Sequence, residues 1–486
     1  MRAAFLTFAT LLLAACTAGP DDGVTDVAIV GSPEDLAETG LRLSYGGQHI
    51  RAATRQGLVA LDAQGQVVPA LAERWIVTDD ATSYIFRIRE IDIAEGERLT
   101  AQAVRDALRQ SFGALDNTTM GLDLAKVRDV RALTSRVVEI RLTSPMPAFL
   151  QLLAQPELAM PASVVDAGPM RMATGDSART LAALPPQMRG LPEREDFEDL
   201  VRPVKVQASD AATALQGFAE GRIDLVLGGR LADLPRVDTG PLARGTLRLD
   251  PAIGLFGLDV KRARGFLAAA DNREALAMAI DRQALVAPFN IGGWLDTTRI
   301  VPAALSGEIG DRPERWADRD IAERRTTAAA RVDAWSAANG GRPSLALALP
   351  QGPGSDTLFA GLAEQLATIG IALRRADTVA EADLVLRDRV ARYGSSRWFL
   401  NQFNCKVTRG LCSEDVDFLV ELANEATSAE ERASYLAEAE AALVAQNGFI
   451  PLGAPIRWAV ARSDVAGFAE NPWAIHPLFP LSLAPM

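Results

Sequence analysis

The clearest strand of this chain shows a strict alternation of hydrophobic and polar positions. Tyr84, Phe86 and Ile88 alternate with Arg87 and Arg89. In an extended segment the three apolar side chains then point to one face and the arginines to the other. The pattern therefore predicts a half-buried strand.

Helical spacing follows this strand. Val104, Ala107, Leu108 and Phe112 fall on one face of a helix, and Thr100 stands where an N-cap belongs. This apolar face predicts a helix that packs on the preceding sheet.

Strands and helices alternate through the rest of the chain. Residues 137–142 alternate again, and residues 204–230 read as strand, helix and strand. A strand at 345–349, a helix at 355–369 and a strand at 382–386 repeat this order. Strand–helix–strand units at this spacing indicate an α/β protein with parallel pairing.

Three local assignments rest on composition more than on periodicity. Residues 69–75 suggest one helical turn after a short extended piece, and residues 44–48 suggest a glycine-rich loop. Residues 271–286 suggest one continuous helix opened by a capping box of Asp271 and Glu274.

Composition and charge exclude one class of function. The chain has 486 residues, 48% of them hydrophobic and 23% charged, as in an ordinary globular protein. The formal net charge is −12, which makes a nucleic-acid-binding role improbable.

The N-terminus resembles a bacterial lipoprotein precursor. Arg2 is followed by an apolar run from Phe5 to Ala15 that is too short to span a bilayer. The run ends in Leu13-Ala-Ala-Cys16, which matches a lipobox, so the resemblance implies cleavage before Cys16 and a lipid on its sulfur. The alternative is an ordinary signal peptide with an incidental cysteine.

An ordered set of motifs resembles the extracellular solute-binding proteins of family five, the receptors of ABC importers. The segment from residue 57 to residue 104 carries the pattern "GLV-turn-PxLAxxW-xxxDxxxYxFxxR-G-xLTAxxV". Its matching residues are Gly57, Leu58, Val59, Pro69, Leu71, Ala72, Trp75, Asp80, Tyr84, Phe86, Arg89, Gly96, Leu99, Thr100, Ala101 and Val104. A second block, residues 271–286, resembles the family's "vRqAlxxAIDRxxlv" run.

This resemblance implies a two-lobed α/β fold of the periplasmic-binding-protein type II class, in the large family-five variant. After a signal peptide at 1–15 and a tether at 16–23, lobe I is expected to comprise residues 24–248 with 455–486. It is expected to carry an inserted subdomain at about residues 48–170, and lobe II is expected at residues 249–454.

The resemblance also selects residues for a ligand cleft between the lobes. Tyr45 lies in the segment that borders the cleft in the family, with a surface aromatic as the alternative. Trp294 follows a glycine pair near the cleft, with a core tryptophan as the alternative. Tyr393, Trp398 and Asn401 belong to a segment that resembles the family's cleft loop.

One departure from the family concerns the residue before Tyr393. Peptide-binding members place there an aspartate that pairs with the peptide amine, whereas this chain has Arg392. A guanidinium repels an ammonium group and suits a carboxylate or phosphate. We therefore expect Arg392 to read an anionic group on the ligand, unless it pairs with an acid such as Asp388 or faces water.

Other chemistry has little support in the sequence. Cys405 and Cys412 remain as a pair in an oxidising compartment, which predicts a disulfide, with free buried thiols as the alternative. Only His49 and His476 are present, far apart, so neither a metal site nor histidine-based acid–base catalysis is expected. The chain lacks nucleophile-elbow, zincin and nucleotide-binding motifs. A glycosidase-like carboxylate pair is not excluded by sequence.

The sequence thus predicts a monomeric solute-binding lipoprotein without cofactors, held at the periplasmic side of the cell envelope. Its expected partners are a peptide-like or other small solute, a membrane permease with its ATPase subunits, and the membrane itself through Cys16. The alternative is a sensory or structural lipoprotein that keeps the fold but not transport.

Overall fold

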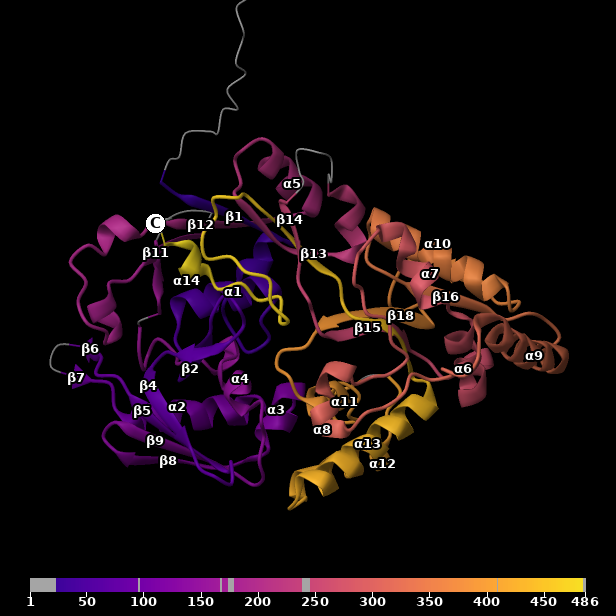
Figure 1. Ribbon diagram of the computed structural model, residues 1–486, viewed down its shortest axis with the longest axis horizontal. Helices are drawn as coiled ribbons and strands as arrows, with labels where there is room; N and C mark the ends of the chain where they lie inside the picture. Colours follow the sequence, from indigo (N-terminus) through magenta and orange to yellow (C-terminus); the bar gives the residue numbers. More distant parts are fainter. Residues whose placement is uncertain are drawn as a thin grey trace, which may run out of the picture.

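The computed structural model describes residues 23–94, 97–166, 168–173, 179–237, 245–408 and 410–483. Cys16 and the expected signal peptide lie outside these residues. Figure 1 shows two lobes side by side, with lobe I and its inserted subdomain in one half and lobe II in the other. Within the described chain, no helix combines the length and the apolar character that a membrane span requires.

Lobe I is built on a seven-stranded sheet. Central strand β1 pairs in parallel with β12 and β13, and the outer strands run antiparallel to their neighbours. The strand order is β10 (Met170–Met172), β11 (Arg179–Ala183), β12 (Val204–Ser209), β1 (Thr25–Val30), β13 (Leu225–Arg230), β20 (Arg457–Ala461) and β14 (Leu247–Leu249). Its helices are α1 (Tyr45–Thr54), α5 (Ala211–Ala219) and α14 (Leu478–Leu481).

Lobe II has a five-stranded mixed sheet covered by helices. The order is β17 (Ala372–Arg375), β16 (Ser344–Ala348), β18 (Leu384–Val390), β15 (Gly254–Val260) and β19 (Phe449–Gly453). The helices are α6 (Ala270–Ala279), α7 (Arg282–Val286), α8 (Ser306–Ile309), α9 (Ile321–Asn339), α10 (Pro353–Ala367), α11 (Ser396–Asn401), α12 (Glu414–Glu425) and α13 (Ala429–Gln446). Two parallel pairs, β16 with β17 and β16 with β18, confirm the parallel pairing expected from the strand–helix–strand order.

The inserted subdomain contains the alternating strand. Its antiparallel sheet has the order β4 (Ala72–Val77), β5 (Ser83–Ile88), β9 (Val137–Leu142) and β8 (Val127–Thr134). The hairpins β2 (Val59–Leu61)–β3 (Val67–Pro69) and β6 (Asp92–Ala94)–β7 (Glu97–Arg98) and the helices α2 (Ala101–Ala114), α3 (Thr119–Leu124) and α4 (Phe149–Leu153) complete it. Tyr84, Phe86 and Ile88 are buried, and the Thr100 hydroxyl accepts a hydrogen bond from the Ala103 amide, as the sequence predicts.

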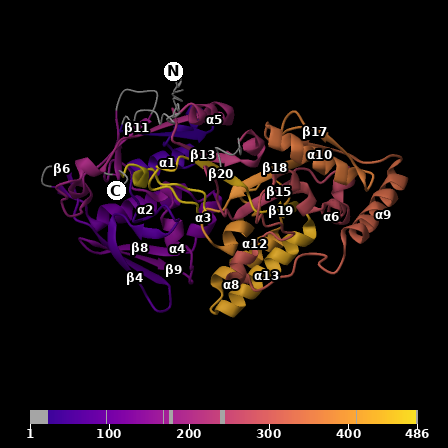
Figure 2. The same cartoon turned by 45° about the horizontal axis from the view of Figure 1, so that its top comes forward.

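Subdomain and lobe II share one continuous hydrophobic core. Phe149 and Leu152 of α4 belong to the same cluster of buried side chains as Phe399 of α11 and Leu436 of α13. Figure 2 shows α3 of the subdomain next to the lobe II helices. The subdomain is therefore packed against both lobes and is not a free appendage of lobe I.

Two strand connections join the lobes. The chain enters lobe II between β14 and β15 and returns between β19 and β20. At this hinge the Asp250 amide donates to the Arg457 carbonyl at 3.1 Å, and the Arg457 guanidinium donates to Asp388 at 2.7 Å. Asp388 therefore pairs with the hinge arginine and not with Arg392.

The structure corrects the three composition-based assignments. Residues 44–48 begin helix α1 and do not form a loop. A Cβ at Gly46 would stand 2.7 Å from the Asp35 carbonyl oxygen, and a Cβ at Gly47 would stand 2.3 Å from the Ala37 carbonyl oxygen, so both positions require glycine. Their glycines serve close packing and not a loop.

The other two corrections concern a strand and a helix. Residues 72–77 form β4, which pairs with β5, so sheet pairing overrides the helix-forming composition there. The helix predicted at 271–286 is interrupted at Ile280, and Asp281 caps α7. Glu274 does not close a capping box; its carboxylate pairs with Arg315 and Arg331.

Candidate functional site

The segment that the sequence assigns to the cleft connects β18 to α11 and faces the inserted subdomain. Asp123 of α3 is the centre of its contacts. The Tyr393 hydroxyl donates to Asp123 Oδ2 at 2.5 Å, Asn401 Nδ2 donates to Oδ1 at 3.1 Å, and the Arg397 guanidinium lies 3.6 Å away. Burial raises the pKa of the Asp123 carboxyl and of the Tyr393 phenol.

These contacts place the predicted ligand residues inside an interlobe network. Tyr393, Asn401 and Arg397 are 1%, 2% and 3% exposed. Trp398 is also buried and packs edge-on against Phe399. The structure thus brings Tyr393, Trp398 and Asn401 together in the packed contact between subdomain and lobe II, and their role in ligand binding stays a prediction.

Arg392 is engaged by the protein itself. Its guanidinium donates to both carboxylate oxygens of Glu157, at 3.2 and 2.7 Å, and its Nε donates to Gln155 Oε1 at 2.7 Å. Gln155 Nε2 returns a hydrogen bond to the Arg392 carbonyl at 2.9 Å. The acidic partner of Arg392 is therefore Glu157 of the subdomain and not Asp388. Arg392 also lines the cavity described below, and its contact with a ligand anion stays a prediction.

Tyr45 and Trp294 lie near the hinge. The Tyr45 ring packs against Gly228 and against His49, with ring centroids 4.4 Å apart, and burial raises its pKa. Trp294 covers Gly453, and its indole N–H donates to the Ala454 carbonyl at 2.9 Å. Neither residue lines the cavity described next.

A cavity of about 320 Å³, partly open to solvent, lies where lobe I, the subdomain and the Arg392 segment meet. Its walls come from the end of α1, the β2–β3 hairpin, residues 154–159 and the C-terminal segment 473–480. Most wall side chains are apolar, among them Val59, Val68, Leu191, Ile475, Leu478 and Phe479. Its volume and its apolar lining are typical of a small-molecule site.

Two arginines that the sequence analysis missed stand in this wall. Arg89 follows β5 and donates its Nε to the Ala70 carbonyl at 2.8 Å. Arg189 ends the short helix Pro186–Arg189 and lies over the Phe479 ring at 4.6 Å. Burial lowers the pKa of both guanidinium groups, and the charge of Arg89 lowers that of Arg189 further.

The alternating pattern predicted the wrong orientation for the Arg89 side chain. The strand ends at Ile88, so Arg89 does not continue to the solvent face where the period-two pattern put it. No signal in the sequence marks Arg189.

A second hollow of about 400 Å³ is bordered by Glu157, and Arg55 borders both this hollow and the cavity described above.

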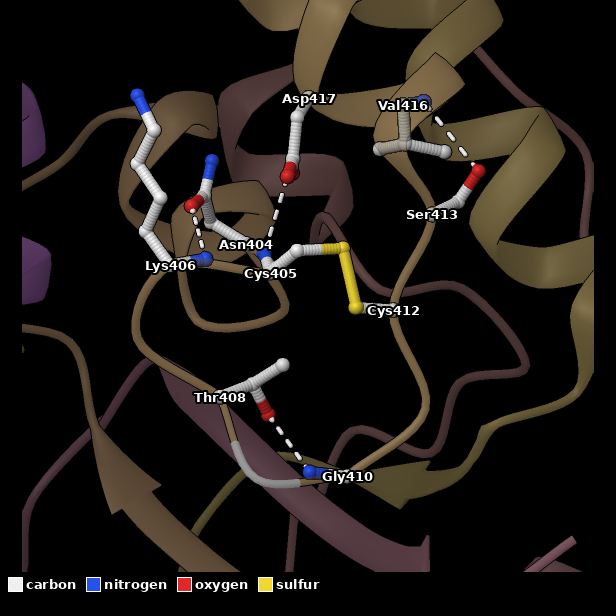
Figure 3. Close-up of a disulfide and its surroundings, with 9 residues drawn as sticks. All are labelled: Asn404, Cys405, Lys406, Thr408, Gly410, Cys412, Ser413, Val416 and Asp417. Atoms are coloured by element: carbon white, nitrogen blue, oxygen red, sulfur yellow. Dashed lines mark hydrogen bonds between the residues drawn. A yellow bond between two sulfur atoms is a disulfide. The ribbon is translucent and has the colours of Figure 1, made fainter.

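Cys405 and Cys412 form a disulfide in the loop between α11 and α12, with Cα atoms 5.2 Å apart (Figure 3). The Cys405 amide donates to Asp417 at 3.0 Å, which ties the loop to α12. Within the described part of the chain, no group of three or more histidine, cysteine or acidic side chains is arranged to hold a metal ion.

A comparison with protein families identifies the class. The model of the bacterial extracellular solute-binding proteins, family 5 Middle, matches residues 66–404. The chain therefore belongs to this family of solute-binding proteins.

Curated relatives match over a shorter stretch. The glutathione-binding protein GsiB of Escherichia coli K12 is 29% identical over 156 residues, which is 32% of this chain and 30% of GsiB. The probable deoxycholate-binding periplasmic protein YgiS of the same strain is 30% identical over 129 residues, 21% of this chain and 23% of YgiS. The chain thus matches about a third of GsiB and a quarter of YgiS.

Solved structures share the whole fold. Haemophilus influenzae OppA in complex with the peptide RPPGFSPFR superposes with a TM-score of 0.78 at 16% identity, covering 96% of this chain and 100% of OppA. The murein tripeptide binding protein MppA of Escherichia coli gives 0.77 at 16% identity over 95% and 99%. Agrobacterial AgaA, solved with agropinic acid, gives 0.67 at 17% identity over 94% and 97%.

Proposed function

We propose that this chain is the solute-binding component of an ABC importer. It captures a small solute among lobe I, the subdomain and lobe II, and presents it to a membrane permease that works with ATPase subunits. Hinge closure of two lobes around a ligand is the established motion of such proteins.

One observation carries the proposal. The cavity of about 320 Å³ is bordered by residues of lobe I, of the subdomain and, through Arg392, of lobe II. A solute in this cavity contacts lobe I, the subdomain and lobe II, which are the parts of the chain that we expect to move when the lobes close. The relatives support the solute class only broadly, since their names refer to glutathione, deoxycholate and peptides.

The proposal extends to location and to the absence of catalysis. A lipid on Cys16 anchors the mature chain at the periplasmic face of the envelope, and residues 16–23 act as a tether. The chain works as a monomer and without a cofactor. It binds its solute and releases it unchanged, as a transport receptor does and an enzyme does not.

Native mass spectrometry of the purified protein tests this function. We expect a co-purified small molecule that is released intact on denaturation and that rebinds with a decrease in the radius of gyration. Uptake of that solute by cells lacking the gene separates transport from a sensory role. Conversion of the solute into a product by the purified chain contradicts the proposal.

A further inference from the structure

The charge of the cavity described above is not balanced by its own carboxylates. Its charged lining residues are Arg55, Arg89, Arg189, Arg392 and Asp62. Asp62 accepts hydrogen bonds from the amides of Gln64 and Gln66, at 3.0 and 2.8 Å, and so is committed to the β2–β3 turn.

The arginines differ in how far the protein satisfies them. Arg392 is neutralised by Glu157, and Arg55 lies 4.0 Å from Glu38. Arg89 and Arg189 have no ion pair within the described residues. The Arg89 side chain makes one hydrogen bond, to a carbonyl, and the buried Arg189 Nε has no hydrogen-bond partner in the part of the chain that the structure describes.

Arg189 is half-buried and is repelled by the charge of Arg89, and the nearby Glu73 carboxylate acts on Arg89 and not on Arg189. Such an arrangement is unfavourable without a further anion. An anion between them removes that repulsion and accepts the hydrogen bonds that neither now makes to a carboxylate. The surrounding wall is apolar, so the body of such a ligand gains free energy from burial. An ammonium group placed there meets further positive charge.

We propose that the solute of this cavity is a small apolar molecule with a single carboxylate, which Arg89 and Arg189 hold while the aliphatic or aromatic body packs on Val59, Leu478 and Phe479. This inference rests on the proposed function and names the solute class. It moves the anion recognition expected of Arg392 to two arginines on the lobe I side of the same space.

Isothermal titration calorimetry of ligand-stripped protein with octanoate, octan-1-ol and octylamine tests the charge requirement. The three probes share one apolar chain and differ in head group. We expect octanoate to bind at least tenfold more tightly than octanol, and octylamine to show no measurable heat. Equal affinities for octanoate and octylamine, or no binding of octanoate, overturn the proposal.

Variants then assign the head-group contact. Arg89→Gln and Arg189→Gln should each weaken octanoate binding about tenfold or more and leave octanol binding unchanged, since a hydrogen bond to a charged group is lost. Arg98→Gln, at a surface arginine whose side chain is 67% exposed, is the matched control. Arg89→Lys and Arg189→Lys, which keep the charge, cover the case in which a glutamine variant fails to fold. Unchanged octanoate affinity in both glutamine variants overturns the assignment.

The solute found by native mass spectrometry separates this inference from the function on which it rests. A bound cationic or neutral solute that closes the lobes leaves the receptor function standing and overturns the carboxylate assignment. A chain that binds no solute and does not close overturns both.

Discussion

The Tyr393 hydroxyl of lobe II donates a 2.5 Å hydrogen bond to the Asp123 carboxylate of the inserted subdomain. Both side chains are 1% exposed. The bond therefore joins two bodies far apart in the sequence inside a region that water does not reach. Together with Asn401 and Arg397 it fixes how lobe II meets the subdomain.

Removal of this hydroxyl should destabilise the protein. Tyr393→Phe leaves the buried Asp123 with one donor fewer, and a hydrogen bond to a charged group contributes about 1.5–3 kcal/mol. Urea unfolding should show a loss of that size. Tyr435→Phe is the control, because the hydroxyl of the half-buried Tyr435 makes no hydrogen bond to a described residue, and it should change the free energy of unfolding by less than about 0.5 kcal/mol. Equal stabilities of the two variants contradict the role of Asp123.

The Arg392–Glu157 pair should show measurable coupling. Their side chains are 22% and 4% exposed, so the pair lies between a surface and a fully buried salt bridge, and we expect a coupling energy of about 1–3 kcal/mol. A double-mutant cycle of Arg392→Gln and Glu157→Gln in urea measures it. The same cycle on Arg194 and Asp196, which are 57% and 59% exposed, should give less than about 1 kcal/mol. Additive effects at both sites show that Arg392 is not held by Glu157.

Local patterns predicted the elements, and long-range contacts decided the site. Period-two and helical spacing gave β5 and α2 because those signals lie within a few residues of each other. The partner of Arg392 is 235 residues away in the chain, and no local signal connects it to Glu157. Arg189 belongs to a short helix whose place beside Arg89 depends on how subdomain and lobe I dock. The family resemblance supplied the architecture, and the ligand roles that it implies for Tyr393, Trp398 and Asn401 stay predictions at residues that are buried in this structure.

The disulfide should be detectable in the native protein. A non-reducing digest analysed by mass spectrometry should contain one peptide pair linked through Cys405 and Cys412. Because the closed loop is short, Cys405→Ser with Cys412→Ser should lower the free energy of unfolding by at most roughly 2–3 kcal/mol. Two unlinked, alkylated peptides from protein kept unreduced contradict the pairing.

The lipobox motif makes a separate prediction about the envelope. Cys16→Ser should stop incorporation of labelled fatty acid and processing at that site, because the lipid is attached to the cysteine sulfur. Cys405→Ser is the matched control and should be labelled like the natural chain. Labelling that persists in Cys16→Ser shows that the leader is an ordinary signal peptide or that another residue is modified.

His49 should make the stability of lobe I depend on pH. The hydrogen bond between its Nδ1 and the Tyr45 carbonyl, 2.7 Å long, leaves Nε2 to accept from the His476 amide at 3.2 Å. When the His49 ring is protonated, Nε2 carries a hydrogen and can no longer accept the hydrogen bond from the His476 amide. Burial, assisted by the charges of His476 and Arg392, lowers the pKa of His49 to about 4, so the folded state favours the neutral ring.

The sign of the effect follows from proton binding. An unfolded histidine titrates near pH 6.5, so between pH 6.5 and 4 the unfolded chain binds a proton that the folded chain does not. The contribution of His49 to stability is therefore complete above pH 6.5 and declines as the pH falls toward 4, by about 3 kcal/mol in all. His49→Gln removes this titration, so its urea midpoint should fall less than that of the natural chain between pH 7 and 4.5. Parallel midpoint curves for the two proteins show that His49 titrates alike in the folded and unfolded states.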